Sequence, residues 1–150
     1  MIIRKAVRED ISELNELLTL LIQDERKYDK NINPDFEVTE MYENYVDDDN
    51  SCLLLAEDDN KHIVGYLFGY LVNEGDVNIN KVSKLDAMFV REEFRRQDIG
   101  SSLVERFKEW SKDKGVKYIE LNVCTRNDIA KILYDRQDFK LVAEVLKYEI

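Results

Sequence analysis

The chain has 150 residues, 44% of them hydrophobic and 36% charged, which suits one globular domain with a core of its own. Its formal net charge of −10, from 32 acidic and 22 basic residues, argues against a nucleic-acid-binding face, because such a face needs basic side chains against the phosphates. An acidic surface favours cationic partners such as amines, and it also serves solubility alone.

Cysteine and histidine are too few to build the common metal sites. Cys52 and Cys124 form no C-x-x-C pair and His62 is the one histidine, so we expect no metal-ligand cluster of these residue types. No apolar run approaches the ~20 residues that a membrane-spanning helix needs, and the first residues lack the apolar segment of a secretory signal. We therefore expect a cytoplasmic protein with reduced thiols and no membrane partner.

In chain order, the first half of the sequence predicts a strand, two helices and a hairpin. Asp10 and Glu13 have the spacing of a capping box, and apolar residues recur after them at helical spacing. Apolar residues with similar spacing between residues 38 and 46 predict the second helix. The expected positions are residues 2–7 (strand), 11–24 (helix), 38–46 (helix), and 52–56 and 62–72 (the strands of the hairpin).

The second half predicts alternating strands and helices. The expected strands lie at residues 82–90, 116–123 and 139–150, where the last stretch forms one or two strands. Between them come a helix that ends at Gly115 and a helix capped by Asn127. The order β-α-α-β-β-β-α-β-α-β indicates a single-domain α/β protein with a mixed sheet and a right-handed βαβ unit over residues 82–123.

One junction in this order suits a phosphate group. The strand ending at Val90 runs into a loop with Arg91, Arg95 and Arg96, and the loop opens directly into a helix. Free N–H groups and the positive end of a helix dipole would lie there beside cationic side chains, as a nucleotide-like cofactor requires. Residues 95–100, Arg-Arg-Gln-Asp-Ile-Gly, also resemble the acetyl-CoA loop Arg/Gln-x-x-Gly-x-Gly/Ala of the GNAT superfamily of N-acetyltransferases.

Two further stretches carry the same resemblance. Residues 127–134, Asn-Asp-Ile-Ala-Lys-Ile-Leu-Tyr, are similar to the family's Asn-x-x-Ala-x-x-Leu/Phe-Tyr helix, and residues 3–6, Ile-Arg-Lys-Ala, to its opening strand. The resemblance implies a single GNAT domain over residues 1–150 that moves an acetyl group from acetyl-CoA, its co-substrate, directly to an amine. It implies no metal.

Two aspartates stand where the family usually has glycine: Asp98 in the loop and Asp138 after the last helix. Aspartate tolerates left-handed backbone angles better than most residues, so we expect both turns to form. A carboxylate ~6 Å from a phosphate costs roughly 3 kcal/mol at an effective dielectric of ~20, and much less when it points into water. We expect Arg91, Arg95 and Arg96 to offset this repulsion, so that cofactor binding persists.

The resemblance also implies where the cofactor lies. Its pyrophosphate would bind the main-chain amides from Arg96 to Ser101, and its pantetheine would pair with the main chain from Met88 to Val90, where the fourth and fifth strands splay. The expected cofactor-binding residues are Met88, Phe89, Val90, Arg95, Arg96, Gln97, Asp98, Ile99, Gly100, Ser101, Asn127, Ala130 and Tyr134.

Acetyl transfer requires a base for the protonated amine, an N–H donor for the oxyanion and an acid for the departing thiolate. Tyr134 corresponds to the family's tyrosine acid and is the candidate we favour; the alternative is a core tyrosine on an amphipathic helix. Asp86 is the first candidate for the base, because strand alternation places it with Met88 and Val90 and burial would raise its pKa. Alternatively, Asp86 is an exposed acid or a ligand of the substrate's ammonium group. Glu120 is the second candidate.

Two other residues are weaker candidates for chemistry. Cys124 would be a covalent nucleophile, but no histidine is near it in the sequence. His62 lies beside a turn and is most simply a residue at the edge of a strand.

The acceptor is the least determined part of the site. Four aromatic residues of the N-terminal region belong either to the core or to an acceptor pocket: Tyr28, Phe36, Tyr42 and Tyr45. The acidic surface and Asp86 favour a small cationic amine such as a polyamine, while an amino acid, an aminoglycoside or a protein N-terminus or lysine stays open. Asp98 favours a second interpretation, in which the protein is a non-catalytic CoA-binding regulatory module. A third interpretation is a purely structural interaction domain, which would bind no CoA. The sequence also leaves open whether the protein forms a homodimer.

Overall fold

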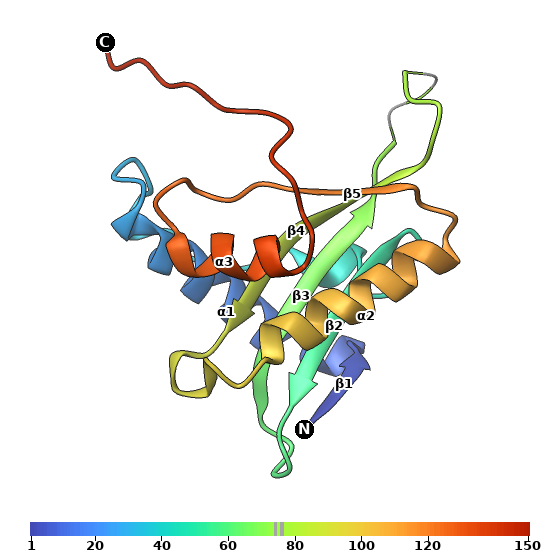
Figure 1. Cartoon of the computed structure of the whole chain (residues 1–150). Helices are drawn as coiled ribbons and strands as arrows, with labels where there is room; N and C mark the ends of the chain where they lie inside the picture. The colour runs from blue at the N-terminus through green and yellow to red at the C-terminus, as the bar shows by residue number, and fades with distance from the viewer. Residues whose placement is uncertain (74, 76) are drawn as a thin grey trace.

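The computed structural model describes residues 1–73, 75 and 77–150, which form one five-stranded sheet with helices on both faces (Figure 1). The strands are β1 (Ile2–Lys5), β2 (Ser51–Glu57), β3 (Ile63–Leu71), β4 (Val82–Val90) and β5 (Tyr118–Leu121). The α-helices are α1 (Ile11–Asp24), α2 (Ile99–Asp113) and α3 (Asp128–Arg136). Short 3-10 turns are η1 (Arg8–Asp10), η2 (Glu25–Lys27), η3 (Tyr42–Asn44) and η4 (Glu92–Phe94).

The strands lie in the order β1-β2-β3-β4-β5, and neighbours are antiparallel except β4 and β5, which are parallel and joined through α2. The predicted mixed α/β sheet, the β2–β3 hairpin and the βαβ unit are therefore confirmed. Within the described ranges, the helices are too short or too polar to cross a membrane.

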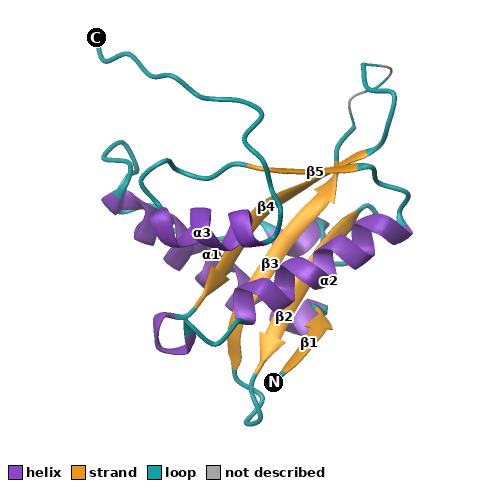
Figure 2. Ribbon diagram, viewed as in Figure 1, coloured by secondary structure: helices purple, strands orange, loops and turns teal. Residues whose placement is uncertain are grey.

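Both faces of the sheet are buried, which explains the nearly continuous apolar sequence of β2 and β3. Leu53 and Leu55 of β2 pack toward α1, whereas Leu54 packs toward α2. Figure 2 shows α2 and α3 in front of the strands and α1 behind them. Gly69 of β3 lets α2 approach the sheet, because a Cβ at this position would lie 2.3 Å from Cε2 of Phe107.

The predicted helix over residues 38–46 is wrong, because only η3 is helical there. Tyr42 and Val46 are buried on the α1 face of the sheet without a continuous helix to carry them. The N–H of Val38 donates instead to Oγ1 of Thr19 in α1 (3.0 Å). Such side-chain acceptors satisfy the main chain outside regular structure, so apolar spacing alone does not guarantee a helix.

The strands predicted over residues 139–150 are also absent. This segment forms no strand and runs as an extended chain away from the body of the molecule (Figure 1). Phe139 packs against the core, whereas the large apolar side chains beyond it are exposed to solvent, as Leu146 is at 89%.

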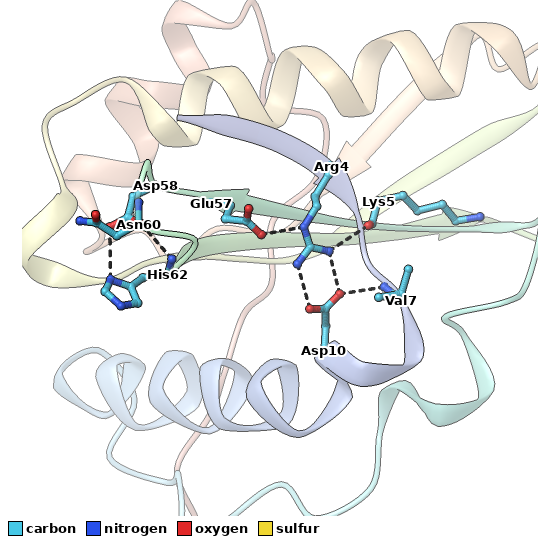
Figure 3. A network of polar contacts seen from close by, with 8 residues as sticks. All are labelled: Arg4, Lys5, Val7, Asp10, Glu57, Asp58, Asn60 and His62. Atoms are coloured by element: carbon cyan, nitrogen blue, oxygen red, sulfur yellow. Dashed lines mark hydrogen bonds and ion pairs between the residues drawn. The ribbon is translucent and has the colours of Figure 1, made fainter.

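Asp10 ties β1 to the start of α1, although it does not form the predicted capping box with Glu13. Its carboxylate accepts two hydrogen bonds from the Arg4 guanidinium (2.8 and 2.9 Å) and one from the N–H of Val7 (2.8 Å; Figure 3). Arg4 also donates to Glu57 of β2 (2.8 Å). Asp10 is buried, and the hydrogen bonds from Arg4 hold the pKa of its carboxyl below the usual value.

Replacing Asp10 with asparagine is expected to lower the free energy of unfolding by about 2 kcal/mol near neutral pH, since Arg4 loses its charged partner at a site with little water. The folded-state pKa of Asp10 lies below its unfolded value, so this contribution is present above the unfolded pKa and is lost as the pH falls through the folded pKa. Urea unfolding of both proteins at about pH 7 and about pH 3 measures the effect. A difference of equal size at both pH values would contradict its ionic origin.

Candidate functional site

β4 has an open edge over its second half. β5 pairs only with residues from Val82 to Leu85 of β4, and beyond that point the two strands separate (Figure 2). Among the described strands, the residues from Ala87 to Val90 pair with β3 alone. The predicted splay of the fourth and fifth strands is confirmed, and it leaves main-chain groups of β4 available to a ligand.

The loop between β4 and α2 presents main-chain N–H groups at the start of the helix. The N–H of Ser102 donates to the carbonyl of Asp98 (3.0 Å). Across residues 1–73, 75 and 77–150, the N–H groups of residues 96–101 have no protein acceptor, and the Asp98 side chain caps none of them. These donors and the positive end of the α2 dipole together form an arrangement that binds anions.

Aspartate sustains the left-handed turns as predicted. Asp98 has φ 61° and Asp138 has φ 66°, and the neighbouring Arg96 has φ 64°. The Asp98 side chain is exposed. Its carboxylate is therefore hydrated, the condition in which repulsion of a nearby phosphate is weakest.

The three arginines of the loop do not act together, contrary to the expectation that all would offset Asp98. Arg91 donates to the carbonyl of Ile63 (3.0 Å) and to Glu13 of α1 (3.2 Å), which directs it toward the α1 side. Arg96 is exposed. A guanidinium that already donates hydrogen bonds to a carbonyl and a carboxylate is less available to a ligand. Arg96 is therefore better placed than Arg91 to contact a phosphate.

Arg95 links the loop to the end of α1. Its Nε donates to the carbonyl of Val90 (2.8 Å), and its guanidinium lies over the ring of Phe89, 5.3 Å from the centroid. One terminal nitrogen lies 3.6 Å from the Asp24 carboxylate. These contacts fix the direction in which the chain leaves β4.

Gly100 is where β4, α2 and α3 meet. A Cβ at this position would lie 2.9 Å from Cδ1 of Leu133 in α3 and 3.6 Å from Cε of Met88 in β4. Glycine therefore allows the first turn of α2 to sit against both neighbours. The N–H donors of the loop, the open edge of β4 and the face of α3 consequently lie close together.

α3 brings two of the predicted site residues to this point. Asn127 caps the helix as predicted, because its Oδ1 accepts a hydrogen bond from the N–H of Ala130 (3.2 Å). Tyr134 packs edge-to-face on Phe139, with ring centroids 5.7 Å apart. Burial, reinforced by the charge of Glu25, raises the pKa of Tyr134 to about 12.

β4 contains a β-bulge at Asp86. Ala87 pairs with Phe68 of β3 while Leu85 pairs with Gly69, so Asp86 is the extra residue. Leu85 consequently packs on the α2 face, and Ala87 packs on the α1 face. The bulge reverses the alternation on which the sequence analysis relied.

The bulge corrects the predicted position of Asp86. Met88 packs on the α2 face, whereas Tyr66 and Tyr70 belong to the α1 face. Burial raises the pKa of both tyrosines, and the Asp86 carboxylate adds to both rises. Asp86 therefore faces the α1 side. Asp86 is exposed, as the alternative of an exposed acid anticipated, and partial desolvation by its neighbours raises its pKa while Lys84 acts in the opposite direction.

Glu25 of η2 is a candidate that the sequence analysis misses. Glu25 is exposed, and partial desolvation, to which the carboxylates of Asp24 and Asp29 add, raises the pKa of its carboxyl. The charge of Glu25 also acts on Tyr134 of α3 and on Tyr66 of the α1 face. The charge of Glu25 therefore reaches both the α3 side of the site and the α1 side of the sheet.

The end of α1 approaches α3 through contacts that no local pattern could have indicated. The Tyr28 hydroxyl donates to Oδ1 of Asn127 (3.5 Å), and Arg126 donates to the carbonyl of Lys27 (3.3 Å). Both contacts join residues 99 positions apart in the chain. They place the acidic group around Glu25 beside the helix that carries Tyr134.

The sequence matches a family model described as "Acetyltransferase (GNAT) family" over residues 14–139. The chain belongs to the GNAT family. The human protein N-acetyltransferase 8 is 27% identical over 104 residues, which are 69% of this chain and 45% of that protein, so the GNAT chain spans less than half the length of this relative.

Solved structures show the same GNAT fold. A mutant of the BH1408 protein from Bacillus halodurans superimposes with a TM-score of 0.90 at 25% identity, covering 100% of this chain and 99% of that one. The aminoglycoside acetyltransferase meta-AAC0020, from an uncultured soil metagenomic sample, has a TM-score of 0.75 at 18% identity and covers 99% of this chain and 94% of its own. At such identity the second similarity supports the fold alone.

The remaining candidate residues of this GNAT domain occupy separate places. Glu120 of β5 is in register with Lys84 of β4 and is exposed. Cys124 is exposed, whereas Cys52 is buried, and burial raises the pKa of the Cys52 thiol to about 12. His62 lies at the β2–β3 turn, where its N–H donates to Asp58 (2.9 Å; Figure 3).

The aromatic residues of the N-terminal region divide between core and surface. Tyr42 is buried, and its hydroxyl lies 3.0 Å from that of Tyr66. Tyr45 packs against the same core. Phe36 is 45% exposed, and Tyr28 contacts α3. Of these four residues, Tyr28 is the one that reaches the site.

Proposed function

We propose that this GNAT protein transfers the acetyl group of acetyl-CoA directly to a primary amine, with a small cationic amine as the preferred acceptor. The observation that carries the proposal is the row of N–H groups over residues 96–101, which lack a protein acceptor in the described chain and lie at the end of an open strand. Phosphate oxygens satisfy such donors well.

The cofactor residues proposed from the sequence fit this arrangement. The pyrophosphate would accept hydrogen bonds from the amides between Arg96 and Ser101, with Arg96 free to approach it from the surface. The pantetheine would pair with the open edge from Met88 to Val90, and an N–H of this edge would stabilise the oxyanion. Asn127, Ala130 and Tyr134 of α3 would line the opposite side.

Two side chains would move the protons of the reaction. Asp86, or an acid near it, would take a proton from the ammonium group, and the amine would then attack the thioester carbonyl. As the carbon–sulfur bond breaks, the Tyr134 hydroxyl would donate a proton to the departing thiolate. Its raised pKa keeps that hydroxyl protonated at every pH in the working range.

The charges around the proposed acceptor side favour a cation. Within the described residues Glu25 forms no ion pair, and Asp86 faces the same side of the sheet. Asp24 pairs with Arg95 and Lys27, whereas Asp29 pairs with Lys147. The net charge of −10 would also attract cationic acceptors over longer distances. Polyamines fit this field best, and aminoglycosides, amino acids and protein amines are the alternatives.

Thiol release from acetyl-CoA, measured against a panel of polyamines, aminoglycosides, amino acids and peptides, tests the proposal. We expect turnover with at least one cationic amine and a lower rate with neutral or acidic acceptors. Acetyl-CoA binding without transfer to any amine would favour the non-catalytic module, and the absence of CoA binding would favour a structural domain.

Replacing Asp98 with glycine is expected to tighten acetyl-CoA binding about threefold, because a hydrated charge ~6 Å from a phosphate repels it by roughly 0.7 kcal/mol. Isothermal titration calorimetry at low ionic strength measures the effect. The matched control is Asp138→Gly, which removes an aspartate with a similar left-handed φ outside the loop. Equal tightening in both variants would show that backbone strain, and not charge, is responsible.

A further inference from the structure

α3, the helix that carries the proposed acid Tyr134, is short and lightly buried. It has nine residues, and none of them is buried. A helix of this length is marginal by itself in water, so contacts with the rest of the fold must keep it formed. At its start, Arg126 and Asn127 contact the segment that follows α1. Tyr134 lies in its last turn, where a helix frays most readily.

The end of α3 closes in a Schellman motif in which Tyr134 takes part. The N–H of Phe139 donates to the carbonyl of Tyr134 (3.0 Å), and the N–H of Asp138 donates to the carbonyl of Asp135 (3.0 Å). Asp138 supplies the left-handed residue of the motif, with φ 66°. The ring of Phe139 packs edge-to-face on Tyr134, which is the apolar contact that accompanies this motif. The direction of the Tyr134 side chain therefore depends on this turn being closed.

Lys108 of α2 holds the closed turn from outside the helix. Its ammonium group donates to the carbonyl of Gln137 (3.0 Å) and to Oε1 of the same residue (2.7 Å). The ammonium group also lies over the ring of Phe139, 5.8 Å from the centroid. Gln137 is the C-cap of α3, where a carbonyl lacks a partner within the helix and a positive charge is favoured by the helix dipole. One cation thus caps the helix and covers the ring that supports Tyr134.

α2 is the rigid partner in this contact. Its inner face is packed against the sheet, and Leu103, Val104 and Phe107 are fully buried there. Lys108 directly follows Phe107, so the core fixes the main chain from which its side chain extends. The short charge-assisted hydrogen bonds to Gln137 therefore tie the weakly held end of α3 to a well-packed helix.

We propose that Lys108 is a positioning residue for Tyr134, an inference that rests on the proposed function. Acting through Gln137 and Phe139, Lys108 keeps the last turn of α3 closed, so that the Tyr134 hydroxyl meets the departing thiolate. Lys108 takes no part in the proton transfer itself. Asn127 and Ala130 lie at the start of α3, which has anchors of its own, so the contacts proposed for them with the cofactor do not depend on Lys108.

Replacing Lys108 with methionine tests the proposal, because it removes the ammonium group and keeps an unbranched stem. We expect kcat to fall about fivefold while the Kd of acetyl-CoA changes by less than about twofold, since a misplaced acid slows only the chemical step. Lys108→Arg retains a cation with several donors and should restore most of kcat. The matched control is Lys112→Met, at an exposed lysine four positions later in α2, and it should change neither quantity. Unchanged kcat in Lys108→Met would overturn the proposal.

A double-mutant cycle shows whether Lys108 acts through Tyr134. In the Tyr134→Phe background, Lys108→Met should lower kcat no further, because the hydroxyl that it positions is already absent. An equal loss in both backgrounds would overturn the proposal, since Lys108 would then act by another route. Failure of the natural protein to acetylate any amine would instead overturn the proposed function, and the panel of acceptors reveals that outcome before the variants are compared.

Hydrogen exchange of the free proteins tests the structural step without any turnover. The amides of Gln137 and Phe139 donate to carbonyls in the last turn of α3, so both should exchange faster in Lys108→Met than in the natural protein. Persistent protection of β2 and β3 in the same measurement shows that the variant is folded. Unchanged exchange at the two amides would also overturn the proposal.

Discussion

Replacing Tyr134 with phenylalanine is expected to lower kcat by about 10-fold or more while leaving the affinity for acetyl-CoA nearly unchanged. The substitution keeps the ring that packs on Phe139 and removes only the hydroxyl that would protonate the thiolate. A 10-fold loss corresponds to ~1.4 kcal/mol of transition-state stabilisation, which is modest for a proton donor. Steady-state kinetics and calorimetric titration with acetyl-CoA separate the two quantities.

The same removal of a hydroxyl at Tyr148, which is 88% exposed, serves as the control and should leave kcat unchanged. The pH dependence supplies a second readout. Because the pKa of Tyr134 is raised to about 12, its protonated form persists across the neutral and mildly alkaline range, so any alkaline fall in rate at moderate pH must come from another group. Unchanged turnover in Tyr134→Phe would contradict the proposed acid.

Replacing Asp86 with asparagine is expected to lower kcat/KM for the acceptor amine by ~100-fold or more, as loss of a general base does. Partial desolvation raises the pKa of the exposed Asp86 carboxyl, although Lys84 opposes this shift, and activity should rise as the pH passes the raised pKa. The variant should lose this acidic limb of the pH profile. Rate measurements from acidic to alkaline pH, with acetyl-CoA saturating, test both points.

Two isosteric controls separate the roles of the neighbouring acids. Glu120→Gln changes an exposed carboxyl on β5 that is in register with Lys84, and it should have little effect. Glu25→Gln changes the carboxyl that acts on Tyr134 and is expected to raise the KM of a cationic acceptor. A rise in KM with unchanged kcat in Asp86→Asn would make Asp86 a ligand of the ammonium group and not the base.

The elements with a local signal could be predicted from the sequence. The 3.6-residue spacing of leucines marks α1, a run of apolar residues marks β4, and Asn127 marks the start of α3, and each element is present in the structure. The helix expected over residues 38–46 has equally good spacing and does not form. Its apolar side chains are held by the sheet and α1, a tertiary contact that periodicity does not reveal.

The site was predictable where it depends on the main chain of a contiguous motif. The loop over residues 95–100 and its left-handed Asp98 follow from residue type and order. The environment of Asp86 does not follow from residue type and order, because the β-bulge in β4 moves Asp86 to the α1 face of the sheet. The proximity of Glu25 to α3 could not be predicted for a different reason. It depends on contacts between residues about a hundred positions apart in the chain.

The bulge makes the length of β4 as important as its composition. Before it, Leu85 faces α2, and after it Ala87 and Phe89 face α1 while Met88 faces α2. Deletion of Asp86, the extra residue, would leave Leu85 and Ala87 adjacent on opposite faces and would keep Met88 and Phe89 in their cores, whereas insertion of one more residue there would turn Phe89 out of one core and Met88 out of the other. During evolution this strand can therefore lose the bulge residue far more readily than it can gain another.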